Sequence, residues 1–271
     1  MPFPYKTVLI TGATAGIGLA LAERMIKAGI FVIAVGRRSD RLNELVAKHG
    51  PEKVAAEPFD VSDLGKLPEW VENIVLNAGF QRAVDFTNPE TISRSSLTSE
   101  MHTNYLSPLH TVTLFLPHLI SIGKNAATPA SIVLVSSGLG LIPVARCANY
   151  CATKSATHSL AWTLRSQLSA PSSPETQHIR VIEIIPPAVQ TELHASQPDL
   201  VMAGQVNIGV PLEEYADETW DLMKAEEITP NDEIIIKLVR ERWSAIESEK
   251  RDTFRTFEAM FRKMAAKDKD A

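Results

Sequence analysis

The sequence has few of the features that mark secreted, membrane or metal proteins. Its two cysteines, Cys147 and Cys151, are four residues apart, where a helix would hold them without easy disulfide geometry, so we expect reduced packing residues. No apolar run reaches the roughly 18 residues that cross a bilayer, and neither HExxH nor CxxC occurs. The sequence therefore predicts neither a disulfide framework, nor a membrane span, nor a metal site.

Basic residues are too scattered to form a binding patch. The net charge is −5, which favours neither a nucleic-acid partner nor an anionic membrane surface. A small molecule is therefore the expected partner. The apolar run "TVLI" begins at residue 7, which leaves no room for a signal or transit peptide before it, so we expect a cytoplasmic protein.

Six short apolar runs rich in β-branched residues alternate with helical patterns. Such runs are typical of strands buried on both faces of a parallel sheet, and the helices between them make βαβ units. We therefore predict a single-domain, doubly wound α/β fold of the Rossmann type, with three layers (α/β/α). The predicted strands are 7–10, 31–35, 53–59, 73–79, 131–137 and 180–185, and the predicted helices are 17–28, 39–48, 99–121 and 148–168.

A glycine-rich turn follows the first predicted strand. The sequence "VLITGATAGIG" places Gly12, Gly16 and Gly18 between that strand and the first helix. Glycine lets the chain turn tightly and bring backbone N–H groups against a pyrophosphate at the positive end of the helix. This pattern predicts a nucleotide site, and a plain strand-to-helix turn is the alternative.

The TGxxxGxG spacing of this turn resembles that of the short-chain dehydrogenase/reductase family. The resemblance covers residues 6 to about 191. "LNAG" at 76–79 is similar to the family's NNAG motif, with Leu76 in place of the first asparagine, and "DV" at 60–61 is similar to the turn that receives the adenine. The cofactor contacts that the resemblance implies are Gly12, Thr14, Ala15, Gly16, Ile17, Gly18, Asp60, Val61, Asn77, Ala78 and Gly79.

The end of the second predicted strand favours NADP(H) over NAD(H). Proteins that select NAD usually place an acidic residue there to bind the ribose hydroxyls. In "VGRRSDR" that place is taken by Gly36, and Arg37 and Arg38 follow with guanidinium groups suited to a 2′-phosphate. A solvated basic loop is the alternative interpretation. Ala15 departs from the basic residue that some NADP-preferring relatives have in the glycine turn.

A serine, a tyrosine and a lysine follow the fifth predicted strand. Tyr150 and Lys154 in "NYCATK" are four residues apart, so a helix places both on one face, and Ser137 lies thirteen residues before Tyr150. The resemblance implies that Ser137 orients the substrate oxygen and that Tyr150 transfers a proton. It also implies that Lys154 holds the nicotinamide ribose and lowers the pKa of the tyrosine, since a nearby ammonium favours phenolate.

One further residue completes this predicted catalytic set. Asn104 in "HTNYLSP" matches the family's asparagine, which supports a proton-relay water beside the lysine. Of the two adjacent serines, Ser137 is the predicted catalytic one, because with Gly140 it forms the family's SxxG ending. Ser136 is then expected to pack inward.

The turn after the sixth predicted strand departs from the family pattern. The family usually has Pro-Gly there, whereas "IIPPAVQTEL" has Pro187 in the glycine's place, which stiffens the turn. A Pro-Pro-x-Val form occurs in a subgroup that resembles the DltE-type oxidoreductases, fungal members included. The further cofactor contacts implied here are Tyr150, Lys154, Pro186, Val189 and Thr191, and the implied substrate contacts are Ser137, Leu139, Tyr150 and Pro187.

We divide the predicted single domain, residues 1–271, into three segments. Residues 6–191 form the dinucleotide-binding and catalytic core, and residues 192–215 form a substrate lid. Residues 250–267 form an amphipathic helix that packs either on its own chain or on a partner in a homodimer or homotetramer. The link 61–73 is near the minimum of roughly 10–12 residues for a βαβ connection, so it is either a stub or the remainder of a longer helix.

The sequence thus predicts an NADP(H)-dependent oxidoreductase that interconverts a carbonyl and an alcohol on a small organic substrate. A protein of the same fold that binds the dinucleotide without turnover, as a sensor or scaffold, is the alternative, and the short link 61–73 keeps it open. A serine hydrolase is excluded, because "SSGLG" lacks the GxSxG elbow.

Overall fold

The computed structural model describes residues 3–65, 77–123, 129–225 and 231–267. These residues belong to two compact units, a main unit (Met1–Ile234) and a C-terminal unit (Ile235–Ala271). Every described strand lies in the main unit, and the C-terminal unit consists mainly of α11 (Lys237–Lys267). Across the described ranges, no helix combines the length and the apolar character that a membrane span needs.

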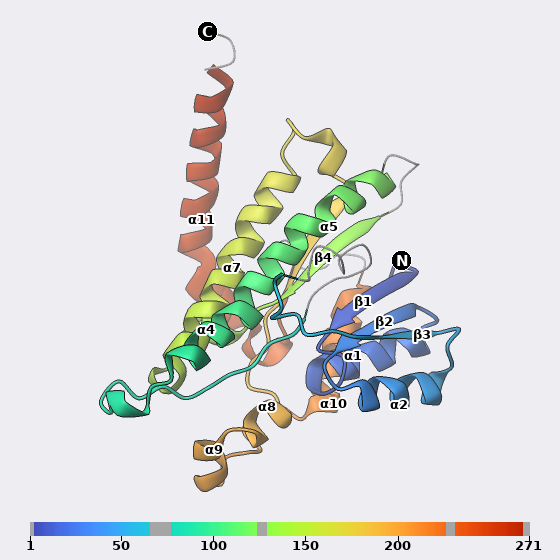
Figure 1. Cartoon of the computed structure of the whole chain (residues 1–271). Coiled ribbons are helices and arrows are strands. Elements are labelled where there is room, and N and C mark those ends of the chain that lie inside the picture. The colour runs from blue at the N-terminus through green and yellow to red at the C-terminus, as the bar shows by residue number, and fades with distance from the viewer. Residues whose placement is uncertain (1–2, 66–76, 124–128, 226–230, 268–271) are drawn as a thin grey trace. The chain divides into compact units, whose positions relative to one another are not determined.

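The main unit opens with a three-stranded parallel sheet in the order β1-β2-β3 (Figure 1). Its strands and connecting helices are β1 (Thr7–Thr11), α1 (Gly16–Lys27), β2 (Phe31–Gly36), α2 (Ser39–His49) and β3 (Val54–Pro58). Gly29 and Gly50 follow the two helices with φ angles of 82° and 91°, a region that favours glycine. These elements confirm the strands and helices that the apolar pattern predicts here.

The second sheet is also parallel, in the order β4-β5-β6. Its strands are β4 (Ala130–Val135), β5 (Ile179–Ile184) and β6 (Glu233–Ile234). The longer helices around it are α4 (Arg94–Met101), α5 (Ser107–Gly123), α7 (Ala148–Leu168) and α10 (Leu212–Lys224). The shorter elements are η2 (Pro89–Thr91), the π-helical turn η3 (His102–Leu106), α6 (Gly138–Leu141), η4 (Ala145–Cys147), η5 (Pro174–Thr176), α8 (Glu192–Ala195) and α9 (Pro198–Met202).

The helix predicted at 99–121 begins earlier than expected. Ser93 caps the start of α4 by accepting a hydrogen bond from the backbone of Ser96 at 3.2 Å, and helical structure continues through η3 into α5. The N-cap serine is the local signal for this start. The π-helical turn has no such signal, and it places Asn104 inside the protein at 1% exposure.

The fourth predicted strand is only partly described. Residues 73–76 lie outside the described residues, as do residues 66–73 of the short link. Residues 77–79 have no regular secondary structure, so the prediction of a strand there is wrong. They are held instead by a side chain, because the Thr11 hydroxyl at the end of β1 accepts hydrogen bonds from the backbone N–H groups of Asn77 and Ala78. Thr11 is fully buried.

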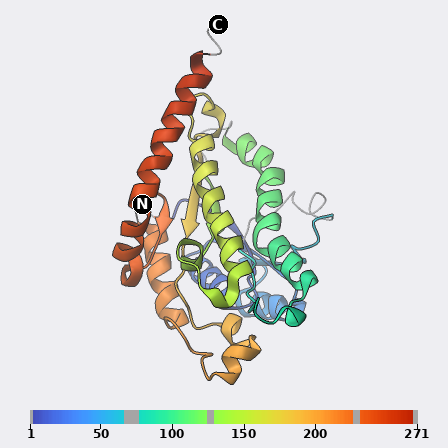
Figure 2. The ribbon, with the colours of Figure 1, turned by 90° about the vertical axis from the view of Figure 1, so that its left-hand side faces the viewer.

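Alternate residues of β4 face opposite sides of the sheet. Ile132 and Leu134 pack with residues of α5 and α7, which run side by side in Figures 1 and 2. Val133 and Val135 pack against a second cluster that contains residues of α1 and α10. Helices therefore cover both faces, which confirms the predicted Rossmann-type α/β/α fold.

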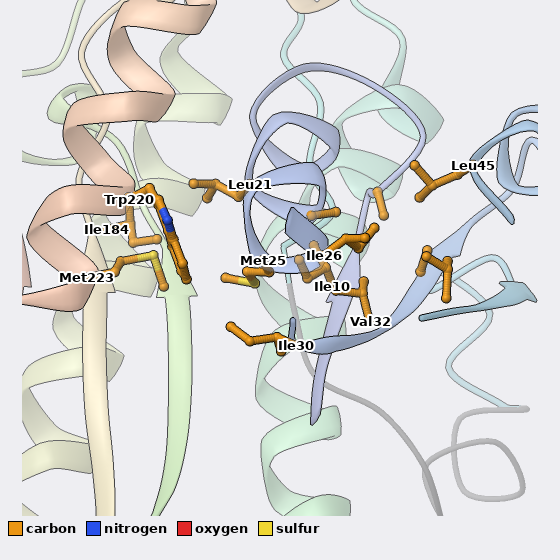
Figure 3. Close-up of a cluster of buried hydrophobic side chains, with 14 of the residues drawn as sticks. Ile10, Leu21, Met25, Ile26, Ile30, Val32, Leu45, Ile184, Trp220 and Met223 are labelled. Atoms are coloured by element: carbon orange, nitrogen blue, oxygen red, sulfur yellow. The ribbon is translucent and has the colours of Figure 1, made fainter. Parts of the chain in front are cut away.

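The second cluster joins the two sheets (Figure 3). It brings the first two strands and α1 against β5 and α10, and its labelled members are Ile10, Leu21, Met25, Ile26, Ile30, Val32, Leu45, Ile184, Trp220 and Met223. Burial of these apolar side chains supplies the main driving force for docking the first sheet on the second. The docking places the carboxyl end of β1 near the elements that follow β4 and β5.

Replacement of Leu42 in α2 tests this cluster. The side chain has 0% exposure and belongs to the cluster, so we expect Leu42→Ala to lower the free energy of unfolding by about 2–5 kcal/mol. Leu114→Ala, the same change at a 38% exposed position of α5, is expected to cost less than about 1 kcal/mol. Urea unfolding of both variants checks this, and equal losses would contradict the packing described.

Candidate functional site

The glycine turn after β1 is a backbone cradle closed by the segment at residues 77–78. Gly12 and Gly16 have φ angles of 69° and 55°. A Cβ at Gly12 would lie 3.2 Å from the Cα of Ala78, and one at Gly18 would lie 2.5 Å from the carbonyl oxygen of Gly12. Side chains at these positions would fill the turn, so the backbone N–H groups at the start of α1 remain accessible to an anion.

Thr14 of this turn is held by two arginines. Arg38 donates from Nε and Nη2 to Thr14 Oγ1 at 3.1 and 2.9 Å, and Arg41 donates from Nη1 to the Thr14 carbonyl at 3.3 Å. Gly36 makes room for Thr14, because a Cβ at this position would lie 2.6 Å from Thr14 Cγ2. The first turn of α2 thus presents two guanidinium groups beside the glycine turn.

Arg37 lies in a different environment. Its side chain is 72% exposed and pairs with Asp60 at 3.8 Å. Asp60 in turn accepts hydrogen bonds from the backbone and hydroxyl of Ser62 at 3.0 and 2.8 Å, while the adjacent Val61 is buried. Of the two predicted arginines, only Arg38 has described contacts with the glycine turn.

Glu192 connects these arginines to the segment after β5. Arg38 Nη1 and Arg41 Nη1 donate to its two carboxylate oxygens at 2.8 and 2.5 Å. The preceding Thr191 caps α8 by accepting from the backbone of Leu193 at 3.3 Å. Thr191 lies against the glycine turn, because a Cβ at Gly16 would be 3.4 Å from its Cβ and Cγ2.

The turn after β5 also contacts the region that follows β4. The Pro186 carbonyl accepts a hydrogen bond from the backbone of Gly138 at 2.9 Å. Pro186 is buried and Pro187 is partly exposed. Val189 forms a β-bridge with Val210, so the base of the predicted lid is closed by backbone pairing.

Ser137 and Tyr150 meet at the carboxyl end of β4. Ser137 caps α6 by accepting from the backbone of Leu139 at 3.2 Å, and its hydroxyl lies close enough to Tyr150 in α7 to influence the pKa of that phenol. Tyr150 is 7% exposed and packs with Leu139 and with the two buried cysteines, Cys147 and Cys151. The structure therefore brings together a serine and a tyrosine that the sequence places thirteen residues apart.

The pKa of Tyr150 is shifted upward in this structure. Burial raises it above the ordinary value for tyrosine, and the nearby hydroxyl of Ser137 opposes this effect in part. The resemblance implies the opposite, a pKa lowered by Lys154. The upward direction arises because desolvation disfavours the phenolate more than its polar neighbours favour it.

Lys154 lies one helical turn after Tyr150 and is 5% exposed. Its ammonium donates to the Val135 carbonyl at the end of β4 at 2.8 Å and lies 5.6 Å from the centre of the Tyr150 ring. Burial lowers the pKa of Lys154 to about 8, although the carboxylates of Glu183 and Glu100 oppose this effect. The lysine can thus change its charge near neutral pH.

Asn104 fixes the backbone next to this lysine. Its side chain accepts from the backbone N–H of Phe80 at 2.9 Å and donates to the Phe80 carbonyl at 2.8 Å and to Thr153 at 3.2 Å. A Cβ at Gly79 would lie 3.2 Å from Asn104 Oδ1 and 3.6 Å from Lys154 Nζ. Asn104, Gly79 and Lys154 are therefore neighbours, as the predicted set requires.

A buried polar network lies behind the catalytic candidates. Glu183 of β5 has 0% exposure, and both of its oxygens lie within 3.0 Å of Nδ1 of His158, which is one helical turn after Lys154. Ser136 is 2% exposed and donates to Glu183. Ser136 therefore points inward, as predicted, and Ser137 is the serine that meets Tyr150.

Residues 6–200 match the model of the short chain dehydrogenase family. The chain belongs to the short-chain dehydrogenase family. An uncharacterized oxidoreductase of Bacillus subtilis, DltE, is 37% identical over 242 residues, which are 84% of this chain and 89% of the relative. A probable NADP-dependent dehydrogenase of Haemophilus influenzae is 34% identical over 176 residues, or 60% of this chain and 66% of that protein. The resemblance stated from the motifs is confirmed, and this short-chain dehydrogenase is an oxidoreductase.

Solved structures agree with this family assignment. A short-chain dehydrogenase of Sphingobium yanoikuyae in complex with NADPH has a TM-score of 0.71 at 25% identity, over 92% of this chain and 94% of that one. A member of the family from Burkholderia phymatum in complex with NAD has a TM-score of 0.74 at 19% identity, over 93% and 96%. The likeness supports the Rossmann-type fold of this short-chain dehydrogenase.

Sequence reasoning did not identify Thr11, Arg41, Glu183 and Glu192. Arg41 could have been found, because it lies three residues after Arg38, in the first turn of the helix predicted at 39–48. Thr11, Glu183 and Glu192 have no comparable signal, since their partners are distant in sequence. Only the fold of this short-chain dehydrogenase brings them to their partners.

Replacement of Lys154 by methionine tests the electrostatics of this site. The pKa of Lys154 is about 8 in the folded protein, against an ordinary value of 10.5. Between these two pH values the unfolded chain therefore binds more protons than the folded protein does. The free energy of unfolding of the wild-type protein therefore rises with pH over this range. Below it, the buried charge of Lys154 lowers the free energy of unfolding by its full amount. We expect Lys154→Met to add about 1–3 kcal/mol to the free energy of unfolding at pH 7, with a smaller gain at pH 9.5.

Urea unfolding at both pH values measures this gain. Lys48→Met is the matched control, because the Lys48 side chain is 59% exposed and its replacement should change stability by less than about 0.5 kcal/mol at either pH. A loss of stability in Lys154→Met at pH 7, or a gain that does not change with pH, would contradict the shifted pKa.

Proposed function

We propose that this short-chain dehydrogenase uses NADP(H) to interconvert a carbonyl and an alcohol on a small organic substrate. The observation that carries the proposal is the burial of Ser137, Tyr150 and Lys154 at one place, with the lysine ammonium 5.6 Å from the centre of the Tyr150 ring. These three groups lie at the carboxyl ends of the strands, where open α/β sheets bind their ligands. The relative named as NADP-dependent and the NADPH complex of the solved relative support the choice of cofactor.

The chain's own residues fit a dinucleotide. Gly12, Gly16 and Gly18 form a backbone cradle that a Cβ would fill, which suits a pyrophosphate at the start of α1. Arg38 and Arg41 provide guanidinium groups suited to a 2′-phosphate. Further proposed cofactor contacts, carried over from the motifs, are Thr14, Ala15, Ile17, Arg37, Asp60, Val61, Asn77, Ala78, Gly79, Pro186, Val189 and Thr191.

The proton chemistry is proposed for Tyr150. When bound, the nicotinamide supplies the hydride. The Ser137 hydroxyl donates to the carbonyl oxygen of the substrate as negative charge develops on it, and the Tyr150 hydroxyl transfers its proton to that oxygen. Lys154 keeps a positive charge close to the phenolate that remains, while Asn104 fixes the backbone beside the lysine. Leu139 and Pro187 are the proposed substrate contacts near this point.

The non-catalytic alternative receives no support from the site. Burial of a lysine and a glutamate costs free energy, and a sensor or scaffold would not need both beside a tyrosine. A homodimer or homotetramer stays a prediction. It is supported by apolar side chains on α11 that are 45–57% exposed, namely Phe257, Met260, Phe261 and Met264.

Replacement of Tyr150 by phenylalanine tests the proposed mechanism. The change removes only the hydroxyl, so we expect turnover with NADPH and a panel of aldehydes and ketones to fall at least about a hundredfold. Binding of NADPH, measured by fluorescence titration, should change less than about threefold. Tyr215→Phe is the control, because Tyr215 is also buried, at 1% exposure, yet lies in α10. Unchanged turnover in Tyr150→Phe would overturn the mechanism.

Replacement of the two arginines tests the choice of cofactor. Each guanidinium would make charge-assisted hydrogen bonds to a 2′-phosphate, so we expect Arg38→Ala and Arg41→Ala each to weaken NADPH binding by about 10- to 100-fold. Binding of NADH should change less than about threefold. Arg37→Ala gives a comparison at a neighbouring, 72% exposed arginine, for which we expect a smaller loss. Equal losses for NADPH and NADH would contradict a 2′-phosphate site.

A further inference from the structure

Glu192 binds both arginines of the proposed 2′-phosphate site. One carboxylate oxygen accepts from Arg38 Nη1 at 2.8 Å, and the other accepts from Arg41 Nη1 at 2.5 Å. The two arginines come from the start of α2, whereas Glu192 is the first residue of α8 after β5. The ion pairs therefore connect the nucleotide-binding half of the main unit to the first residues of the predicted lid.

The two guanidinium groups are fixed in place independently of Glu192. Arg38 also donates twice to Thr14 Oγ1, and Arg41 donates to the Thr14 carbonyl. Both arginines thus face one anion while Thr14 of the glycine turn holds them. The side chain of Glu192 is 52% exposed, so solvent and solutes reach this carboxylate.

A carboxylate and a phosphate compete for the same guanidinium donors. Both accept hydrogen bonds from the planar fork of arginine, and the phosphate carries more charge and more acceptor oxygens. Hydrogen bonds from Arg38, and to a smaller extent from Arg41, lower the pKa of Glu192. This carboxylate is therefore ionised at neutral pH. An incoming 2′-phosphate therefore meets donors that an anion of the chain already occupies.

We propose that Glu192 competes with the 2′-phosphate of NADP(H) for Arg38 and Arg41, and thereby limits the preference of the protein for the phosphorylated cofactor. This inference rests on the proposed function, because it assumes that the two arginines bind the 2′-phosphate. A cofactor without that phosphate leaves Glu192 on the arginines. A cofactor with it exchanges one anion for another, so the arginines remain paired in both states.

The position of Thr191 extends this competition to the glycine turn. Thr191 lies against Gly16, and Glu192 follows it directly. Release of the carboxylate from both arginines frees the first residue of α8, next to the backbone that would bind the pyrophosphate. The phosphate at the adenosine end of the cofactor is thus linked to the first residues of the lid.

Calorimetric titration with two adenosine nucleotides tests the competition. Adenosine 2′,5′-bisphosphate and adenosine 5′-monophosphate differ only in the 2′-phosphate, and neither contains nicotinamide. We expect Glu192→Gln to tighten binding of the bisphosphate by about five- to tenfold and to change binding of the monophosphate by less than about twofold. Low ionic strength keeps the ion pairs at this exposed site from being screened.

Glu213→Gln is the matched control for net charge. Glu213 is also an exposed glutamate paired with an arginine, Arg24 at 2.9 Å, but it lies at the start of α10. This variant should leave the affinities for both nucleotides within about twofold of wild type. In an Arg38→Ala background, the gain from Glu192→Gln should shrink, because one of the contested donors is gone.

The outcomes separate the inference from the function on which it rests. A wild-type protein that binds both nucleotides equally well, with no further change in Arg38→Ala, would overturn the 2′-phosphate site and the competition together. A wild-type protein that prefers the bisphosphate, but whose affinity does not increase in Glu192→Gln, would overturn the competition alone. Equal tightening for both nucleotides would also overturn it, because Glu192 would then only cover the site.

Discussion

The buried ammonium group of Lys154 is the constraint on which the rest of the site depends. It donates to the last carbonyl of β4, so α7 has to pack at a fixed position along that strand. A Cβ at Gly140 would lie 2.8 Å from the backbone carbon of Lys154, so this glycine lets α6 approach α7 closely. The carboxylate of Glu183 favours the charged lysine from β5. Burial of one cation thus requires α6, α7, β4 and β5 to meet in one arrangement.

The two ends of the proposed cofactor site use charge in different ways. Around Lys154 the charged side chains are almost fully buried, so their geometry is fixed and their pKa values move far from ordinary ones. Around Thr14 the side chains of Arg38, Arg41 and Glu192 are 41%, 39% and 52% exposed, so these ion pairs contribute little to stability and exchange readily. One end therefore has the fixed geometry that the proposed catalysis needs, and the other has the exposure that the proposed exchange of anions needs.

The sequence predicted those parts of the fold and site that local patterns determine. The β-branched run before Ser137 predicts that this serine follows a strand. The four-residue spacing predicts that Tyr150 and Lys154 lie on one face of a helix. Both predictions need only the local pattern of a strand and of a helix. The π-helical turn at Asn104 and the contact of Thr11 with residues 77–78 were not predictable. Both depend on backbone groups distant in sequence, which the fold brings close. The strand prediction failed at residues 77–79, where an apolar run ends in small residues held by Thr11.

The proposed preference for a 2′-phosphate follows from a set of contacts rather than from one arginine. An acidic residue in place of Gly36 would favour NAD(H), but its Cβ would lie 2.6 Å from Thr14 Cγ2. Thr14 cannot easily move away, because Arg38 holds its hydroxyl and Arg41 holds its carbonyl. The same two arginines therefore provide positive charge for a phosphate and keep Thr14 against the place where an acid would stand. Charge and steric exclusion thus act together at the end of β2.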